Sequence, residues 1–484
     1  MDVRATLWTD SGIYRRRYEK AANALIAVEQ ALRTSRPLGG AEDEFLDLYR
    51  VVASADPRRF TQVWQDPFAY FWARLAYELV GSCVNATPPP PRLERYCVAL
   101  GASAPAGALA LHLEEFKKLV LALEMISGRD RHFRRPLETR LPFSIAASRY
   151  SVIGAGAIQV SDIVDGTLNA IHDGRPVRLR PGAAVIGPEM PRLVTRSVVR
   201  RGECELVLKP EAFFLPGVDA ADALRDLSEH FQEQQVALLE DALALIERHQ
   251  PSAFEHLAEV VRVIALKPAA AGDYSNVSYS DLPGAFILTA VEDPYWIADA
   301  LIHELFHNRL FFIEDGQRIL VEPDEGDDVA DFYSPWRDEL RPLSGLLHAL
   351  YVYIPVCRFW LSVWRSAETS GLRKAYVEDQ AVRGSLQLRI AARQLRRYAG
   401  FTDFGAELFK ELETEVEAVR ATVDGLRLSP SAPAMIARVD GQIVVGGVGP
   451  DDRPLTVIDT IRDHVKRYDV RGECGDLEAI LNRG

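Results

Sequence analysis

Apolar residues recur every three or four positions in three stretches of the first 140 residues: AANALIAVEQALRT, EDEFLDLYRVVAS and GALALHLEEFKKLVLALEMI. This spacing places the apolar side chains on one face of a helix. The pattern therefore predicts a helical N-terminal region over residues 1–140. Within it, the Arg-rich run 129–140 is expected to be a solvated turn that leads into the next region.

The pattern changes to alternation of apolar and polar residues after residue 140, in stretches such as YSVIGAGAIQVSD and RSVVRRGECELVLKP. Alternation is typical of half-buried strands. The pair Asp173-Gly174 separates two such stretches and predicts a tight hairpin, because both residue types tolerate positive φ. We expect a small antiparallel β region over residues 141–217.

Helical spacing returns over residues 219–268 and again over 294–313, 342–366, 372–398 and 403–425. Between them, NVSYSDLPGAFILTA (276–290) predicts one or two strands around a Leu-Pro-Gly turn. We therefore expect one domain over residues 218–426. A Ser/Pro-rich linker then leads into an appendage at 427–484, with a second Asp-Gly hairpin and one helix. The predicted fold class is α+β, mainly α.

Composition narrows the function classes. The chain has 484 residues, is 48% hydrophobic and carries a net charge of −13, so it is globular and its overall field does not favour nucleic acid. Five dispersed cysteines favour a reducing cytoplasm over a disulfide scaffold. The N-terminal residues lack the apolar run of a signal peptide. The apolar stretch 346–364 contains His348, Pro355 and Arg358, so we expect a buried core helix and no membrane span.

The sequence His303-Glu304-Leu305-Phe306-His307 is the strongest chemical signal. A spacing of four places His303 and His307 on one face of a helix, one turn apart, where both imidazoles can reach one metal ion. Glu304 beside them could handle a proton or hold a water molecule. Because the surrounding helix is apolar, burying these groups without a partner would be costly. The motif therefore predicts a metal site on a zincin-like HExxH helical core.

The third metal ligand is less directly indicated. Leu310 and Ile313 occupy the positions where the extended HExxHxxGxxH pattern requires Gly and His. The acidic run 322–331 offers carboxylates but resembles a solvated loop. His348, in the middle of an apolar helical stretch, is the better candidate. Arg341, Gly345 and His348 recur at helical spacing, so a long Arg side chain could hold one end of a small diacid whose other end meets the metal.

The block YSPWRDELRPLSGLLHALYVY (333–353), together with HELFH, is similar to the HExxH-domain proteins found beside ribosomally made peptide precursors. That family is understood as α-ketoglutarate-dependent, HExxH-type peptide β-hydroxylases. The resemblance covers roughly residues 220–425. It implies an oxidoreductase that uses Fe(II), α-ketoglutarate and O₂ to hydroxylate a side-chain β-carbon of a ribosomally synthesised precursor peptide.

The resemblance also implies roles for individual residues. The metal ligands would be His303, His307 and His348. Arg337 and Arg341 would bind the α-ketoglutarate carboxylates. Glu304 and Tyr351 would form hydrogen bonds within the site. Arg presents a planar fork that suits carboxylates. The residues do not select the metal, since three imidazoles suit zinc equally well.

Two other functions remain open from the sequence. A zinc metallopeptidase would use Glu304 as general base on a zinc-bound water. Residues 276–290 could then align a peptide by strand addition, although the same strand would serve a peptide hydroxylase equally well. A non-enzymatic peptide-binding protein would retain its function when His303 is replaced.

Overall fold

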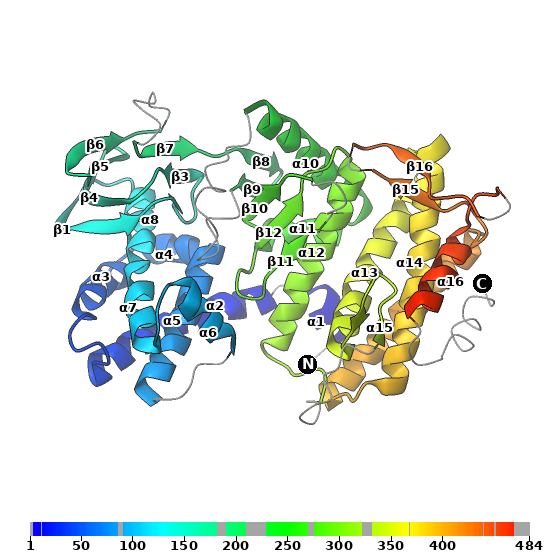
Figure 1. Ribbon diagram of the computed structural model, residues 1–484, viewed down its shortest axis with the longest axis horizontal. Helices are drawn as coiled ribbons and strands as arrows, with labels where there is room; N and C mark the ends of the chain where they lie inside the picture. Colours follow the sequence, from blue (N-terminus) through cyan, green and yellow to red (C-terminus); the bar gives the residue numbers. More distant parts are fainter. Residues whose placement is uncertain are drawn as a thin grey trace.

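The computed structural model describes residues 3–10, 12–85, 91–181, 190–209, 229–269, 275–321, 332–366, 368–438, 440–449 and 452–468. Their buried apolar side chains form two clusters, and each cluster is the core of one lobe. Figure 1 shows the N-terminal lobe on the left and the C-terminal lobe on the right. The class is α+β and mainly α, as predicted.

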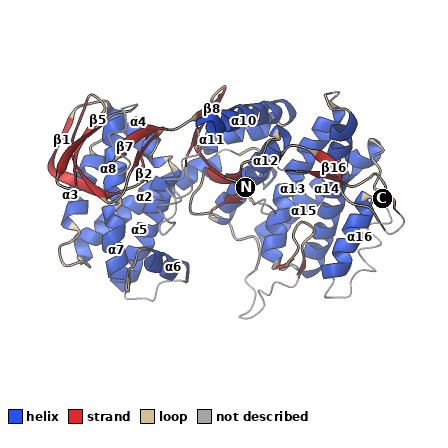
Figure 2. Ribbon diagram, turned by 45° about the horizontal axis from the view of Figure 1, so that its top comes forward, coloured by secondary structure: helices blue, strands red, loops and turns tan. Residues whose placement is uncertain are grey.

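The N-terminal lobe packs helices beneath two antiparallel sheets, which are ordered β1-β4-β5-β6 and β2-β3-β7 (Figures 1 and 2). Its helices are α2 (Gly12–Ser35), α3 (Asp43–Ala53), α4 (Pro57–Trp64), α5 (Pro67–Asn85), α6 (Pro91–Ala99), α7 (Pro105–Glu114) and α8 (Phe116–Ser127). Its strands are β1 (Arg131–Arg140), β2 (Phe143–Ser144), β3 (Tyr150–Ile153), β4 (Ala157–Val164), β5 (Thr167–His172), β6 (Arg175–Leu179) and β7 (Arg192–Thr195).

Two local predictions for this lobe have different outcomes. The Asp173-Gly174 hairpin is confirmed: both residues have positive φ, 47° and 72°, and the flanking His172 and Arg175 pair across β5 and β6. The turn expected at 129–140 is wrong, because this segment forms β1. Leu137 and Thr139 are buried between exposed neighbours, as in a strand with one buried face. The register of β1 shifts between His132 and Leu137, so the alternation of buried and exposed residues does not run through the whole segment and the sequence does not show it.

A five-stranded sheet separates the two lobes, in the order β11-β12-β10-β9-β8. Its strands are β8 (Val198–Arg201), β9 (Cys204–Leu208), β10 (Val263–Lys267), β11 (Val277–Ser278) and β12 (Ala285–Thr289). Strands β9, β10 and β12 are parallel, whereas the edge strands β8 and β11 are antiparallel to their neighbours. Alternate residues of β10 enter different cores: Val263 joins the N-terminal cluster and Ile264 the C-terminal cluster.

The helical pattern expected over 254–268 is therefore only half correct. Helix α11 ends at Val260, and the apolar residues that follow form β10. Strands that are buried on both faces carry continuous apolar runs without alternation, and such runs are difficult to distinguish from a buried helix.

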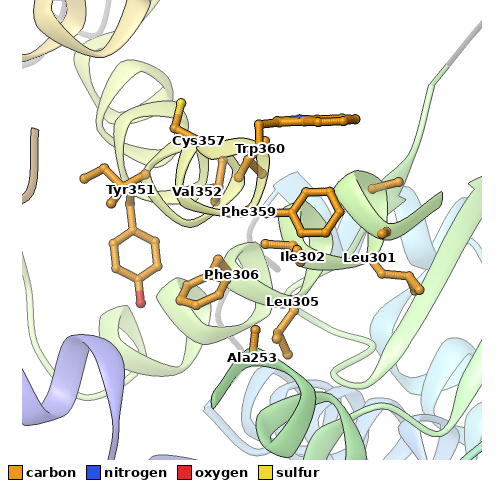
Figure 3. Close-up of a cluster of buried hydrophobic side chains, with 14 of the residues drawn as sticks. Ala253, Leu301, Ile302, Leu305, Phe306, Tyr351, Val352, Cys357, Phe359 and Trp360 are labelled. Atoms are coloured by element: carbon orange, nitrogen blue, oxygen red, sulfur yellow. The ribbon is translucent and has the colours of Figure 1, made fainter. Parts of the chain in front are cut away.

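The C-terminal lobe contains the other helices of the described residues. They are α1 (Val3–Trp8), α10 (Glu229–His249), α11 (Pro251–Val260), α12 (Pro294–Glu314), α13 (Leu343–Arg365), α14 (Gly371–Tyr398), α15 (Asp403–Gly425) and α16 (Val457–Tyr468). Two short hairpins accompany them, β13 (Phe332–Tyr333) with β14 (Leu340–Arg341) and β15 (Met435–Ala437) with β16 (Ile443–Val445). Figure 3 shows apolar side chains such as Ile302 and Phe306 of α12 and Phe359 of α13 at the contact between these two helices.

Helix α13 is the one described helix with the length and apolarity to cross a membrane, but 72% of its apolar window is buried inside the protein. This agrees with the predicted core helix. Two segments from outside the predicted domain at 218–426 also pack into the C-terminal core. Helix α1, from the 1–140 region, packs into the C-terminal core, and so does α16 of the 427–484 appendage through Val457, Ile461 and Val465.

Candidate metal centre

Helix α12 carries the HELFH sequence and is fixed at its beginning by a local signal. The buried Asp293 carboxylate accepts a hydrogen bond of 2.9 Å from the Tyr295 amide, and Pro294 occupies the first turn. An N-cap acceptor followed by Pro is the expected start of a helix. The sequence prediction of this helix is confirmed, and the two histidines lie one turn apart on it.

The imidazoles of His303 and His307 converge. Their Nε2 atoms are 3.1 Å apart, and the ring centroids are separated by 4.7 Å. Two nitrogens bound to one metal ion at about 2.1 Å, at a right angle, would lie about 3 Å apart. The observed separation therefore fits two ligands of one ion.

The protonation of this pair also suits metal binding. Burial, and secondarily the charge of Arg337, lowers the pKa of His303 to about 4. Burial and the neighbouring cations hold the pKa of His307 well below its usual range. Both rings are neutral near pH 7, as ligand imidazoles must be. The Nδ1 atom of His307 is buried without a hydrogen-bond partner.

His348 lies beside this pair but makes a different contact. Its ring centroid is 5.8 Å from that of His307, while its Nε2 is 3.0 Å from both carboxylate oxygens of Glu314. Within the described ranges, no group of three His, Cys, Asp or Glu side chains is close enough to close a metal site. The structure brings together two of the predicted ligands, with His348 adjacent to them.

Glu314 is a candidate that the sequence reasoning missed. It is the last residue of α12, eleven positions after His303, and eleven residues are about three helical turns. Both residues therefore lie on the same face. The spacing of eleven residues in the sequence could therefore have indicated Glu314 as a candidate ligand. The acidic residues of 322–331, which the sequence offered instead, lie outside the described residues.

The two predicted arginines approach the histidines from the hairpin β13–β14. Arg341 ends β14, and Arg337 is exposed in the connecting loop. The positive charge of both lowers the pKa of His307. Arg341 donates to the Glu339 carboxylate at 2.9 and 2.7 Å. Since α13 begins only at Leu343, Arg341 is not on the helical stripe expected from its spacing.

The hairpin is fastened to two other helices. Gln387 and Gln394 of α14 donate to backbone carbonyls of Pro335 and Tyr333, at 2.7 and 2.9 Å. The Tyr333 hydroxyl lies 2.7 Å from Nδ1 of His464 on α16. These contacts hold the arginines at a defined place relative to α12.

Glu304 is buried on the side of α12 that faces the edge strand β11. Its residue is 2% exposed, and burial raises the pKa of its carboxyl to about 7, against the opposing influence of Ser278 and Arg337. A carboxyl with a pKa near the working pH is suited to accept and release a proton.

Tyr351 is not brought to the histidines. Its hydroxyl donates to the Leu7 carbonyl at 2.8 Å, and its ring stacks on Trp8, with centroids 5.4 Å apart. In Figure 3 the Tyr351 hydroxyl points toward α1, in agreement with its bond to Leu7. The tyrosine at the site is Tyr353, whose ring edge meets His303 at a centroid separation of 4.9 Å. The sequence pattern could not predict that Tyr353 contacts His303, because the crossing of α12 and α13 determines which face of α13 meets His303.

The two residues that follow His307 anchor α12 on its other side. The buried Asn308 accepts a hydrogen bond from the Gly284 amide at 2.9 Å. Gly284 has φ +80°, and a Cβ atom there would lie 2.3 Å from the Val260 carbonyl oxygen. The fully buried Arg309 donates to carbonyls at the end of α1. Contacts with the sheet and with the N-terminal segment thus fix the position of helix α12.

Comparison with known proteins adds no family assignment. No protein-family model matches the chain, and no curated protein matches it significantly.

Proposed function

We propose that the protein is a cytoplasmic iron(II)/α-ketoglutarate-dependent dioxygenase that hydroxylates a side-chain β-carbon in a ribosomally synthesised precursor peptide. The observation that carries the proposal is the convergence of the His303 and His307 Nε2 atoms, at a place where the positive charges of Arg337 and Arg341 are felt. When bound, iron(II) with α-ketoglutarate and O₂ supplies the chemistry that replaces a C–H hydrogen by hydroxyl and releases succinate and CO₂.

The surrounding residues have separate tasks in this proposal. Arg341 and Arg337 would bind the carboxylates of α-ketoglutarate, since a guanidinium can donate two parallel hydrogen bonds to a carboxylate. For Arg341 this means exchanging Glu339, a half-exposed partner, for the cosubstrate. Glu304, with its pKa near 7, would hold a proton or orient a water beside the histidines.

The third ligand would be either His348 or Glu314, which contact each other. Three imidazoles suit zinc as well as iron, whereas two histidines and one carboxylate form the ligand set of non-haem iron oxygenases. Separate replacement of His348 and Glu314 by Ala distinguishes these sets, because only loss of the true ligand lowers iron affinity strongly.

The peptide would lie along the edge strand β11. This strand is antiparallel to β12 and packs beside α12, and its outer edge has no strand neighbour among the described residues. An extended peptide can add to such an edge through main-chain hydrogen bonds. An antiparallel edge strand next to the HExxH helix also supports the zincin-like description of the core.

The test is an anaerobic titration of the iron(II)-loaded protein with α-ketoglutarate. Chelation of the metal by the cosubstrate should produce a visible charge-transfer band. Arg341→Met should weaken α-ketoglutarate binding by ~10-fold or more, the effect of losing a charge-assisted hydrogen-bond pair. Arg134→Met, which removes an exposed arginine of β1, is the matched control. A native protein that gives no band contradicts the proposal.

A zinc metallopeptidase is the second candidate, and the burial of Glu304 is the observation that favours it. A general base with a pKa of about 7 is what metal-assisted peptide hydrolysis needs. In this case the zinc-loaded protein cleaves a precursor peptide and Glu304→Gln abolishes the cleavage. An intact peptide after incubation with the native zinc protein excludes this candidate.

A further inference from the structure

A cavity of about 400 Å³ lies beside the candidate metal centre and opens to solvent. Helices α12, α13 and α14 form one side, and the hairpin β15–β16 with α16 forms the other. The residues that matter for its chemistry are Trp296, Asp299, Tyr353, Tyr376 and Arg383.

Asp299 brings an unbalanced negative charge to this cavity. Its carboxylate accepts a hydrogen bond of 2.6 Å from the Trp360 indole, and in the described part of the chain no cationic side chain forms an ion pair with it. Burial raises its pKa to about 6, so the group is ionised at pH 7.5. Burying a carboxylate among apolar groups costs free energy unless a cation or hydrogen-bond donor binds to it.

Among the described residues that line the cavity, Arg383 is the one cation, and its charge is already neutralised. It donates to both carboxylate oxygens of Asp379, at 2.9 and 2.8 Å, and to the Thr460 hydroxyl at 2.9 Å. Asp379 is fully buried. The charge that the cavity presents to a ligand is therefore that of Asp299.

Aromatic rings form the rest of the relevant wall. Trp296 donates to the Tyr376 hydroxyl, and Tyr376 meets Trp360 edge-on with ring centroids 5.5 Å apart. Tyr353 is held by a parallel stack with Trp336, at 4.6 Å. Aromatic faces with a nearby carboxylate attract an ammonium or guanidinium group. An anion would be repelled by Asp299, and an apolar group would leave the carboxylate unpaired.

The cavity and the candidate metal centre share a wall. The Tyr353 ring that lines the cavity also contacts His303. Asp299 precedes His303 by four residues on α12, which is about 6 Å along the helix axis. A group bound in the cavity is therefore close to whatever reacts at the histidines.

We propose that this cavity binds the side chain of a lysine or arginine residue of the peptide substrate. That the bound peptide is a substrate rests on the proposed function, whereas the binding of the cationic side chain does not. If the peptide is oxidised at the histidines, a Lys or Arg should lie within about three residues of the oxidised position, since an extended chain advances ~3.3 Å per residue.

The experiment measures binding of three small probes to the full chain, kept metal-free with a chelator at pH 7.5. The probes are Nα-acetyl-lysine methylamide, the arginine analogue and the neutral norleucine analogue of similar shape. Saturation-transfer NMR and calorimetry report binding without any turnover. We expect at least one cationic probe to bind ~10-fold or more tightly than the norleucine probe, which corresponds to about 1.4 kcal/mol.

Asp299→Asn should abolish this preference while keeping the side-chain shape and an acceptor for Trp360. Asp440→Asn, an exposed carboxylate on the loop of the adjacent hairpin, should leave it unchanged. Equal binding of all three probes, or no binding of either cation by the native protein, overturns the proposal without requiring any variant. Because no metal is present, these outcomes are independent of whether the protein is a hydroxylase.

Discussion

Arg309 should be a main support of helix α1. Its guanidinium donates to the carbonyls of Leu7, Thr6 and Asp10 at 2.6, 2.7 and 3.1 Å, and to the Tyr14 hydroxyl at 3.0 Å. These carbonyls lie at the end of a helix, where backbone acceptors lack partners and a cation is favourable. At a net ~1 kcal/mol for each backbone bond, replacing Arg309 by Met should cost about 3 kcal/mol.

The assay is hydrogen exchange of the amides in residues 3–10, followed by mass spectrometry. The Thr9 and Asp10 amides donate to the Ala5 carbonyl and report directly on the end of α1. A loss of about 3 kcal/mol in the local opening free energy accelerates their exchange about 150-fold. Arg58→Met, at an exposed arginine of α4, should have no such effect. Unchanged exchange in Arg309→Met would refute the reasoning.

Three further predictions follow from packing and protonation. Gly384→Ala should lower the thermal unfolding midpoint, because its Cβ would lie 2.2 Å from the Cys357 sulfur, whereas Gly81→Ala, at an open helical position, should raise it slightly. Burial lowers the pKa of His112 from 6.5 to about 4, so the unfolded state takes up its proton first. Stability should fall by up to about 3 kcal/mol as the pH drops from 6.5 to 4, and His112→Gln should show a weaker pH dependence in urea unfolding. His464→Ala should weaken α-ketoglutarate binding several-fold in the anaerobic titration, since it releases the hairpin that carries the arginines; unchanged affinity would contradict this role.

The sequence predicted those parts of the site that depend on local structure. Helix α12 follows from the helical spacing over residues 294–313, and the common face of His303 and His307 follows from their spacing of four. The buried state of α13 follows from polar residues that a membrane would not tolerate. These features need only neighbours along the chain, so one sequence is sufficient to predict them.

What the sequence did not predict depends on long-range packing. The contact of His348 with Glu314 and the place of Tyr353 arise from the angle at which α13 crosses α12. Strand β10 was mistaken for helix because both of its faces are buried between the lobes. The contacts of α1 with the C-terminal core include the bonds from the buried Arg309, a residue that no periodic pattern along the chain indicates.

The central claim is that His303 and His307 hold a metal ion that oxidises a peptide. The most direct test is the intact mass of a precursor peptide co-expressed with the native protein, with His303→Ala, and with His132→Ala as the exposed-histidine control. We predict that the native protein and the control add one oxygen atom to the peptide, while His303→Ala leaves it unmodified. A peptide that is cut, or left unchanged by the native protein, would contradict the account.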